Sequence, residues 1–360
     1  LHLSVRSNNH AKRELRQTMA DFHKVQELGL DEDTTLKILE RLRHISQLYR
    51  TGKPLFPRRL LEDLSRQIDE GKEEVCIPDF DDVPQVYSLK VPNWCTDFAN
   101  TYRINYQSIH YLSCPTPFCP EFVLRSDHAP VTIGYMRSSG PSGSTFEAIR
   151  GAFVRQRQIW LESPGRQNLE HHLATLKTTA NIRKIVCFGL GSLGRLCGYH
   201  CTRAHTQHAA VETMAASLAK RGLNNSQEIK CYAQDPVYDE VDQEFLRSIG
   251  ITPLEDPKGF LQVDEHTLVF SVSPNVPVKQ IVADLHWPAA MIWNTVTPSE
   301  KDKCWVKRTE KNGTVGWTCP FTTDPDSGRV RRMIKHYAQA QLKDPADYFG
   351  DLTIYMKCEE

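Results

Sequence analysis

The sequence predicts an α/β fold with a Rossmann-like, mostly parallel sheet that is covered by helices on both faces. Between residues 183 and 297, apolar runs typical of buried strands alternate with amphipathic helical patterns. A glycine-rich segment, Gly-Leu-Gly-Ser-Leu-Gly, follows the first of these strands. Right-handed crossovers would place the carboxyl ends of the parallel strands on one rim of the sheet, where such folds bind their ligands.

Composition indicates an ordinary globular chain. It has 360 residues, 40% of them apolar, with 44 basic and 44 acidic side chains. The balanced charge gives no sign of a nucleic-acid partner, although a local patch would be enough to bind one. No apolar run is long enough to span a membrane, so we expect no membrane association. Eleven cysteines without a framework spacing, and no signal-peptide pattern, predict reduced thiols in a cytoplasmic protein.

The chain divides into three predicted parts: residues 1–150, a helical and irregular region packing on the core; residues 151–300, the Rossmann-like core; and residues 301–360, an extension of strand and helix. In the first part, three- and four-residue apolar spacing predicts helices at 31–49 and 58–68, with a weaker helical pattern at 11–28. Frequent prolines from 75 to 131 predict loops with a few short strands, and residues 138–144 form a turn or flexible loop.

The core elements follow in order. Strands are expected at residues 182–188, 228–233, 251–254, 267–272 and 291–293. Helices are expected at 146–161, 169–180, 195–221, 241–249 and 278–285, and a last one at 329–342.

The glycine loop is the first candidate site. Gly189, Gly191 and Gly194 fit the pattern G-x-G-x-x-G, in which glycines let a ligand approach the backbone and the helix start attracts negative charge. The alternative is a purely structural tight turn. A dinucleotide would also need an acid about twenty residues further on, but Asp235 closes the second strand about forty residues after the loop. We therefore expect no nucleotide cofactor.

Ser192 lies inside this loop, where either a nucleophile or the N-cap of the following helix would sit. A serine hydroxyl needs a base. If one continuous helix began at residue 195, His205 and His208 would lie about 20 Å from Ser192, too far unless that helix is broken. We therefore expect a base from another strand end, near Asn275 or Asp235.

Polar residues also follow two other strands. Asp235, Tyr238 and Asp239 come after the second strand, and Ser271, Ser273 and Asn275 after the fourth. Their position on the rim favours ligand contact. Turn formation and helix capping, with Asp239 as the cap, explain the same residues without a ligand.

The helix after the glycine loop carries a dense group of metal-binding residue types: Cys197, His200, Cys201, His205 and His208. Zinc sites use such residues but need a second ligand pair elsewhere, and the sequence offers no convincing one. Cys114 and Cys119 are spaced too widely for a zinc knuckle. We expect cysteines that pack, histidines that face solvent or a ligand at the glycine loop, and no metal.

A basic stripe lies on the last predicted helix. Arg329, Arg331, Arg332 and Lys335 would share one helix face. A solvated surface is one explanation, and contact with RNA phosphates is the other.

Several segments resemble the sensitivity-to-red-light-reduced (SRR-like) domain family. The order of strand, glycine loop with serine, helix with Gln207, strand with Asp235-Pro236, and helix ending at Gly250 is similar to that family. The segments 51–57, 160–163, 273–281 and 287–293 look like its lead-in and its fungal branch. The resemblance implies a Rossmann-like fold but no single activity. Plant and yeast members are regulatory proteins, whereas some fungal proteins of this kind are arginine-containing cyclodipeptide synthases of secondary metabolism.

The resemblance makes an aminoacyl-tRNA-dependent cyclodipeptide synthase the leading hypothesis, with arginyl-tRNA and a second aminoacyl-tRNA as partners. Its site would have Ser192, Asp235 and Asn275 as catalytic residues. The expected substrate-binding residues are Gly189, Gly191, Gly194, Gln207, Glu212, Tyr238, Asp239, Ser271 and Ser273. Asp235, Asp239 and Glu212 would select the guanidinium. The alternatives are a non-catalytic regulator that binds a nucleotide or a partner, and a nucleotide-cofactor enzyme such as a methyltransferase or oxidoreductase.

Overall fold

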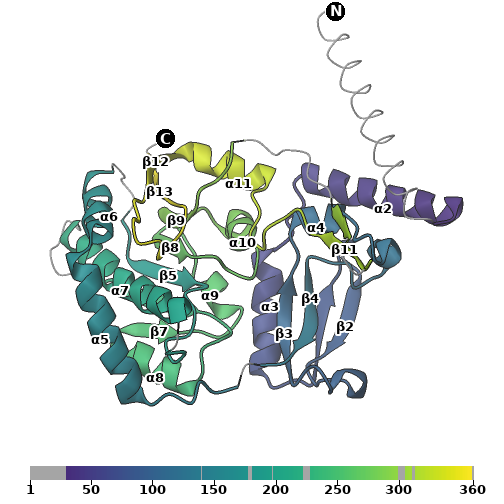
Figure 1. Cartoon of the computed structure of the whole chain (residues 1–360). Coiled ribbons are helices and arrows are strands. Elements are labelled where there is room, and N and C mark those ends of the chain that lie inside the picture. Colours follow the sequence, from purple (N-terminus) through teal and green to yellow (C-terminus); the bar gives the residue numbers. More distant parts are fainter. Residues whose placement is uncertain are drawn as a thin grey trace, which may run out of the picture.

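The computed structural model contains one large sheet with helices on both faces, joined to an N-terminal region of hairpins and helices (Figure 1). It describes residues 30–138, 140–176, 181–196, 198–221, 228–298, 305–309 and 313–358. The weak helical pattern at 11–28 lies outside these residues. Within them, no helix combines the length and the apolar character needed to cross a membrane.

Seven strands form the central sheet, in the spatial order β12 (Tyr337–Gln341), β13 (Leu352–Lys357), β9 (Ala290–Asn294), β8 (Thr267–Ser271), β5 (Lys184–Phe188), β6 (Lys230–Gln234) and β7 (Ile251–Pro253). The five strands from β9 to β7 are parallel, and β13 runs antiparallel to both β9 and β12. The predicted α/β class is confirmed. Residues 337–357, expected as an extension, complete this sheet.

One face of the sheet is covered by four helices: α5 (Phe146–Glu162), α6 (Pro164–Thr175), α7 (Gly198–Arg221) and α8 (Glu240–Ser248). Alternate strand residues such as Ile185 and Leu268 point into this layer, where they pack with Trp160 and Met214. The α6 helix begins at Pro164, earlier than predicted, because Ser163 caps it and proline suits the first helical position.

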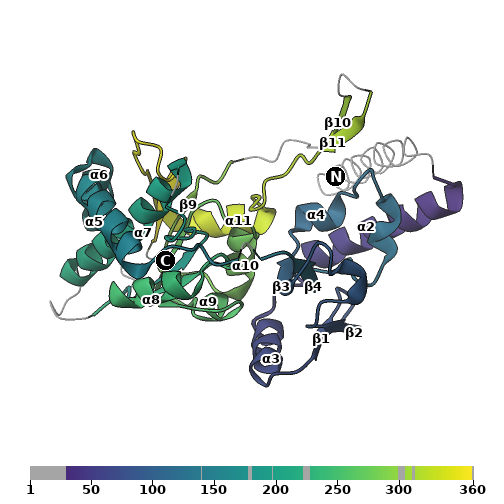
Figure 2. The same ribbon diagram turned by 60° about the horizontal axis from the view of Figure 1, so that its bottom comes forward.

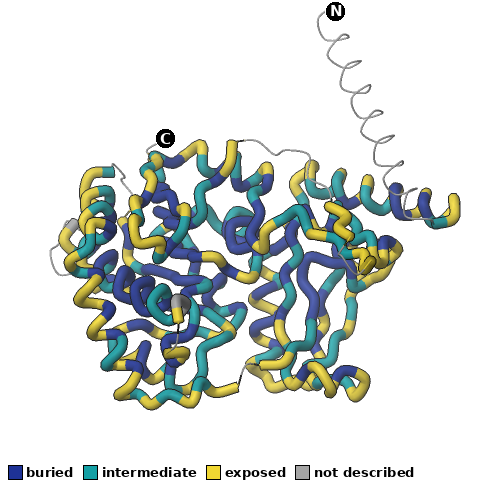
Figure 3. The backbone as a smooth tube through the Cα atoms, in the orientation of Figure 1, coloured by how far each residue is buried: buried dark blue, intermediate teal, exposed yellow. Residues whose placement is uncertain are grey.

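The other face packs against α9 (Lys258–Leu261), α10 (Val278–Leu285), α11 (Gly328–Met333) and the N-terminal α3 (Arg58–Asp69). The same apolar cluster runs without interruption into the N-terminal region. Figure 3 shows buried backbone on both sides of this boundary. The core therefore spans both parts of the chain.

The N-terminal region is more regular than its prolines suggest. It contains the antiparallel hairpins β1 (Glu74–Pro78) with β2 (Pro84–Ser88) and β3 (Thr101–Tyr106) with β4 (Val131–Met136). Around them lie α2 (Glu32–Arg50), α4 (Ile109–Ser113) and the short turns η1 (Asn93–Cys95) and η2 (Pro120–Leu124). In Figure 2 the hairpin of β10 (Val306–Thr309) and β11 (Val315–Thr318) projects beside α4 and α2.

Candidate functional site

The glycine loop lies at the point where the order of the sheet reverses. From β5 the chain moves outward through β6 and β7, and it then returns to form β8 on the other side of β5. Open α/β sheets bind ligands at such a switch point. Gly189 and Gly191 have φ values of 70° and 80°, which favour glycine. A Cβ on Gly189 would lie 2.9 Å from the Cα of Pro274, so the loops after β5 and β8 touch.

Two carboxylates hold the amides of the glycine loop. The Gly191 N–H donates to Asp235 Oδ2 at 2.9 Å, and the Gly194 N–H donates to Asp242 Oδ1 at 2.7 Å. Asp235 Oδ1 also accepts the Val237 N–H at 3.1 Å. In a dinucleotide-binding loop, such amides face the phosphates. Here they are already bonded to side chains of the protein.

Ser192 is 7% exposed and lies between these two partners of the loop. Its Oγ accepts the Gly194 N–H at 3.2 Å, and its hydroxyl also hydrogen-bonds Asp242. The N-cap alternative is wrong for Ser192, because α7 begins only at Gly198. The serine is therefore fixed by the loop and by α8, not by the helix that follows it in sequence.

Asp242 is a site residue that the sequence analysis missed. It is fully buried, and burial raises its pKa, while hydrogen bonds from Ser192 and Gly194 act in the opposite direction. It also forms a capping box with Asp239, the predicted cap of α8. The Asp-x-x-Asp spacing was the available signal for this box, but nothing local indicated that Asp242 reaches the glycine loop.

Asp235 and Asp239 differ in the direction of their pKa shifts. Burial raises the pKa of Asp235 against the opposing effect of the Gly191 and Val237 amides. Burial acts in the same sense on Asp239, but hydrogen bonds from Asp242 and Ser142 hold its pKa below the usual value. The rim thus carries one acid with raised proton affinity and one that is firmly ionised.

His205 lies against the glycine loop, which corrects the expected distance of about 20 Å based on ideal helical rise. Its Nε2–H donates to the Leu193 carbonyl at 2.9 Å, and its Nδ1 lies 3.7 Å from Cys201 Sγ. The helix does not continue from residue 195, so α7 returns over the loop. Burial lowers the pKa of His205, which keeps the ring neutral and uses both nitrogens structurally.

The buried His208 of α7 and the half-buried Tyr238 before α8 form a second hydrogen-bonded pair. His208 Nδ1–H donates to the Ala204 carbonyl at 2.7 Å, which leaves Nε2 to accept the Tyr238 hydroxyl at 2.9 Å. Burial lowers the pKa of His208 to about 4. Tyr238, predicted to bind substrate, is therefore engaged with α7.

The residues after β8 divide into buried and exposed groups. Ser271 is fully buried, and its Oγ has no hydrogen-bond partner among the described residues. Ser273 and Asn275 are exposed beside the glycine loop, and Ser273 has a φ of 48°. A positive φ is uncommon for serine and is found at functional turns.

Two predicted substrate-binding residues point away from the rim. Gln207 Nε2 donates to the Tyr348 carbonyl at 2.7 Å, which fastens α7 to the C-terminal segment. Glu212 pairs with Arg157 of α5 and acts electrostatically on Cys231, near the start of β6. Because Asp235 follows the opposite end of β6, Glu212 does not join the acids of the rim.

The predicted basic helix face is wrong in its geometry. The helix α11 ends at Met333, a short turn η3 (Ile334–His336) follows, and Tyr337 begins β12. Arg329 is 15% exposed, pairs with Asp284 at 2.7 Å and donates to two backbone carbonyls. Arg331 donates to the Asp326 carbonyl, so Arg332 and Lys335 are the exposed pair among the four predicted RNA contacts.

Among the described residues, we find neither a metal-binding cluster nor a disulfide at this site. No group of three or more His, Cys, Asp and Glu side chains is placed to hold a metal there. No disulfide joins the cysteines in that part of the chain. Cys197 lies outside it.

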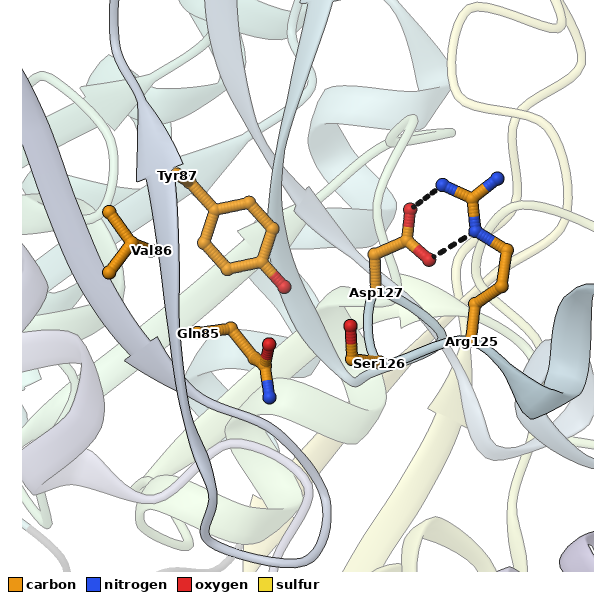
Figure 4. Close-up of a pocket in the computed structure, with 6 residues that line it drawn as sticks. All are labelled: Gln85, Val86, Tyr87, Arg125, Ser126 and Asp127. Carbon is orange, nitrogen blue, oxygen red and sulfur yellow. Dashed lines mark hydrogen bonds and ion pairs between the residues drawn. The ribbon is translucent and has the colours of Figure 1, made fainter.

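Two shallow pockets lie elsewhere. One of about 350 Å³ is formed by Gln85, Val86 and Tyr87 of β2 with the segment after η2 (Figure 4). The Arg125–Asp127 ion pair lies on the side of this pocket opposite β2. The second, about 390 Å³, lies between α6 and α7. Neither is lined by a residue of the glycine loop.

The fold and the site together define an α/β protein with a glycine loop at its switch point. A family model described as the SRR1 domain matches residues 166–356, and the chain belongs to that family. The match covers the central sheet from β5 to nearly the end of β13. No curated protein and no solved structure matches the chain significantly.

Proposed function

We propose that this SRR1-domain protein is an aminoacyl-tRNA-dependent cyclodipeptide synthase that forms an arginine-containing cyclic dipeptide. The observation that carries the proposal is the contact between Ser192 and Asp242 at the switch point of the sheet. A carboxylate whose pKa is raised by burial is a better proton acceptor than an ordinary aspartate. Residues 273–281 and 287–293 resemble the fungal branch of the family, some of whose members are cyclodipeptide synthases, and this resemblance supports the same activity.

The chemistry requires one serine and no nucleotide cofactor. Ser192 Oγ attacks the ester carbonyl carbon of arginyl-tRNA, the bond from that carbon to the ribose oxygen breaks, and the serine proton passes through Asp242 to that oxygen. The amine of a second aminoacyl-tRNA then attacks the acyl-serine carbonyl carbon, the bond from that carbon to Ser192 Oγ breaks, and the amine proton returns to Oγ, which leaves a dipeptidyl-tRNA. The amine of the arginyl residue finally attacks the remaining ester carbonyl, and the bond to the ribose oxygen breaks to release the second tRNA and the cyclic dipeptide.

Arginine selection falls to the acids of the rim. Asp235 and Asp239 each accept two backbone amides, and an ionised carboxylate has about four acceptor positions. Asp235 therefore retains capacity for a guanidinium, which binds carboxylates through parallel hydrogen bonds, whereas Asp239 also interacts with the Ser142 hydroxyl and the Val241 amide and contributes mainly its negative charge. Arg332 and Lys335 would contact the tRNA phosphates, because they are the exposed pair among the four basic residues predicted to bind RNA.

Ser192→Ala tests this proposal. Incubation of the wild-type protein with radiolabelled arginyl-tRNA should leave acid-stable label on the chain. Ser192→Ala should fold and carry at least tenfold less label, because the acyl acceptor is gone. Ser126→Ala, which removes an exposed hydroxyl far along the chain, is the matched control. Equal labelling of Ser192→Ala and wild type would exclude Ser192 as the acceptor.

A regulatory, non-catalytic role is the second candidate, and one observation favours it. Ser192 is nearly buried, and the Gly191 and Gly194 amides already have partners. A loop that only holds β5, β6 and α8 together would look the same in this state. No label on any variant, together with unaltered folding, would favour this candidate.

A further inference from the structure

The glycine loop is covered by a short segment from another part of the chain, residues 140–144. The Ser142 N–H donates to Asp239 Oδ2 at 2.7 Å, and Ser144 Oγ–H donates to the Gly194 carbonyl at 2.5 Å. A Cβ on Gly194 would overlap the hydroxyl of Ser142, so the contact is close. The last two of these contacts are made at Gly194, two residues after Ser192, which is itself nearly buried.

The construction of this segment suits opening. Ser142 and Ser144 face inward, whereas Gly140, Pro141 and Gly143 are exposed. Gly140 and Gly143 have φ values of 68° and 73°, and nothing lies within 4 Å of where their Cβ atoms would be. The inward face holds no large apolar side chain. One of its two hydrogen bonds is to the Asp239 carboxylate, and together they favour the closed state by roughly 30- to 2000-fold, so the open state is a minor state that thermal motion still reaches.

The segment is held at two places. A residue before it is bonded to the N-terminal hairpin, and the segment itself is bonded to the candidate site. The Ser138 N–H donates to Asn100 Oδ1 at 2.7 Å, which holds the preceding residues to the β3–β4 hairpin. Asp239, which receives Ser142, shares its capping box with Asp242, the partner of Ser192. Residues 140–144 therefore connect the N-terminal hairpin with the carboxylate that holds the serine.

We propose that residues 140–144 are a lid over Ser192, and that the lid must open before an acyl donor can reach the hydroxyl. The identity of that donor rests on the proposed function, whereas the opening of the lid does not. In the closed state the lid excludes water from the Ser192–Asp242 contact. Its glycines allow it to swing while both ends remain attached.

Alkylation of a cysteine placed at residue 192 measures the opening directly. In a Ser192→Cys protein, iodoacetamide labelling of residue 192 is followed over time by mass spectrometry of its peptide. Adding Ser144→Ala removes the bond to Gly194, and Gly143→Ala strains the closed backbone. Each change should speed labelling of residue 192 by about three- to tenfold, which corresponds to the free energy that one hydrogen bond contributes to the closed state.

Two controls keep the result specific. Thr145→Ala removes a neighbouring hydroxyl that caps α5 but does not touch the glycine loop, and labelling should stay unchanged. The buried Cys187 and Cys231 report loosening of the whole core. Unchanged labelling of residue 192 in both lid variants, or a parallel rise at Cys187 and Cys231, would overturn the lid. Faster labelling in a protein that accepts no arginyl group would keep the lid and reject the proposed function.

Discussion

Aspartates organise the candidate site by accepting backbone amides. The carboxylate of Asp235 accepts a hydrogen bond from the Gly191 amide, and that of Asp242 accepts one from the Gly194 amide. The carboxylate of Asp239 accepts hydrogen bonds from the amides of Asp242 and Ser142. Charge-assisted bonds of this kind are short and strong, so the loop is fixed before any substrate arrives. The same bonds engage the Gly191 and Gly194 amides, which in a dinucleotide site would face the phosphates.

Arg329 shows how a residue predicted as surface becomes structural. Its guanidinium pairs with Asp284 of α10, donates to the Tyr49 and Lys53 carbonyls, and lies 3.9 Å from the centre of the Tyr49 ring. Asp284 in turn accepts the amides of Leu55 and Phe56. Arg329 and Asp284 therefore dock residues 49–56 onto α11 and α10.

Removing Arg329 should therefore destabilise the protein. Arg329→Ala leaves Asp284 buried without its cation, and we expect a loss of about 3 kcal/mol in the free energy of unfolding, measured by urea denaturation. Arg332→Ala, on the same helix but exposed, should change it by less than about 0.5 kcal/mol. Equal and small effects of the two replacements would contradict the docking role.

At the scale of elements, the sequence predicts regular periodic segments well. The pattern predicts α10 with its observed bounds, and it finds β5 to β9 within a few residues. The pattern fails where the same residues fit both the apolar spacing of a helix and that of a strand. The pattern predicts a helix over residues 337–341, but pairing with β13 makes them an edge strand, because tertiary pairing outweighs the high helix propensity of Ala and Gln.

The sequence predicts where the site lies in the fold, but it does not predict which side chains contact one another there. The glycine loop and the residues after β6 and β8 do meet on the rim, as parallel topology requires. Asp242 and the lid depend on contacts between residues from 48 to 97 positions apart, and the return of α7 depends on one that spans 12 positions. Local patterns carry no signal for such contacts. The break before α7 was the decisive local feature, since it brings His205 to Leu193.

At the scale of the molecule, the N-terminal hairpins and the sheet share one core and one buried polar contact. The Tyr106 hydroxyl of β3 donates to Asp256 Oδ1 at 2.6 Å, and Gln234 of β6 donates to the same oxygen at 3.0 Å. Gln234 Oε1 also accepts the Gly259 amide at 2.7 Å. This chain of bonds joins the hairpin to the carboxyl end of the sheet.

The contact should make stability depend on pH. Burial raises the pKa of Asp256 from 3.8 to about 7, against the effect of its two hydrogen-bond donors. The folded state therefore keeps a proton that the unfolded state releases between about pH 4 and pH 7. The stability contributed by this group is present below pH 4 and is lost as pH rises to about 7.

Asp256→Asn should remove this dependence while keeping an acceptor for Tyr106. The free energy of unfolding of the variant, relative to wild type, should increase between pH 5 and pH 8. Asp82→Asn, which alters an exposed acid, should show no such trend. A constant difference between Asp256→Asn and wild type across this range would contradict the role given to Asp256.

The central claim is that the site transfers aminoacyl groups from tRNA, and product analysis tests it most directly. Cells that express the chain, and cells that express Ser192→Ala, should be compared by mass spectrometry of their small molecules. The account predicts an arginine-containing cyclic dipeptide in the first culture and none in the second, at equal amounts of folded protein. The absence of such a product from the wild-type culture, or its undiminished presence with Ser192→Ala, would contradict the account.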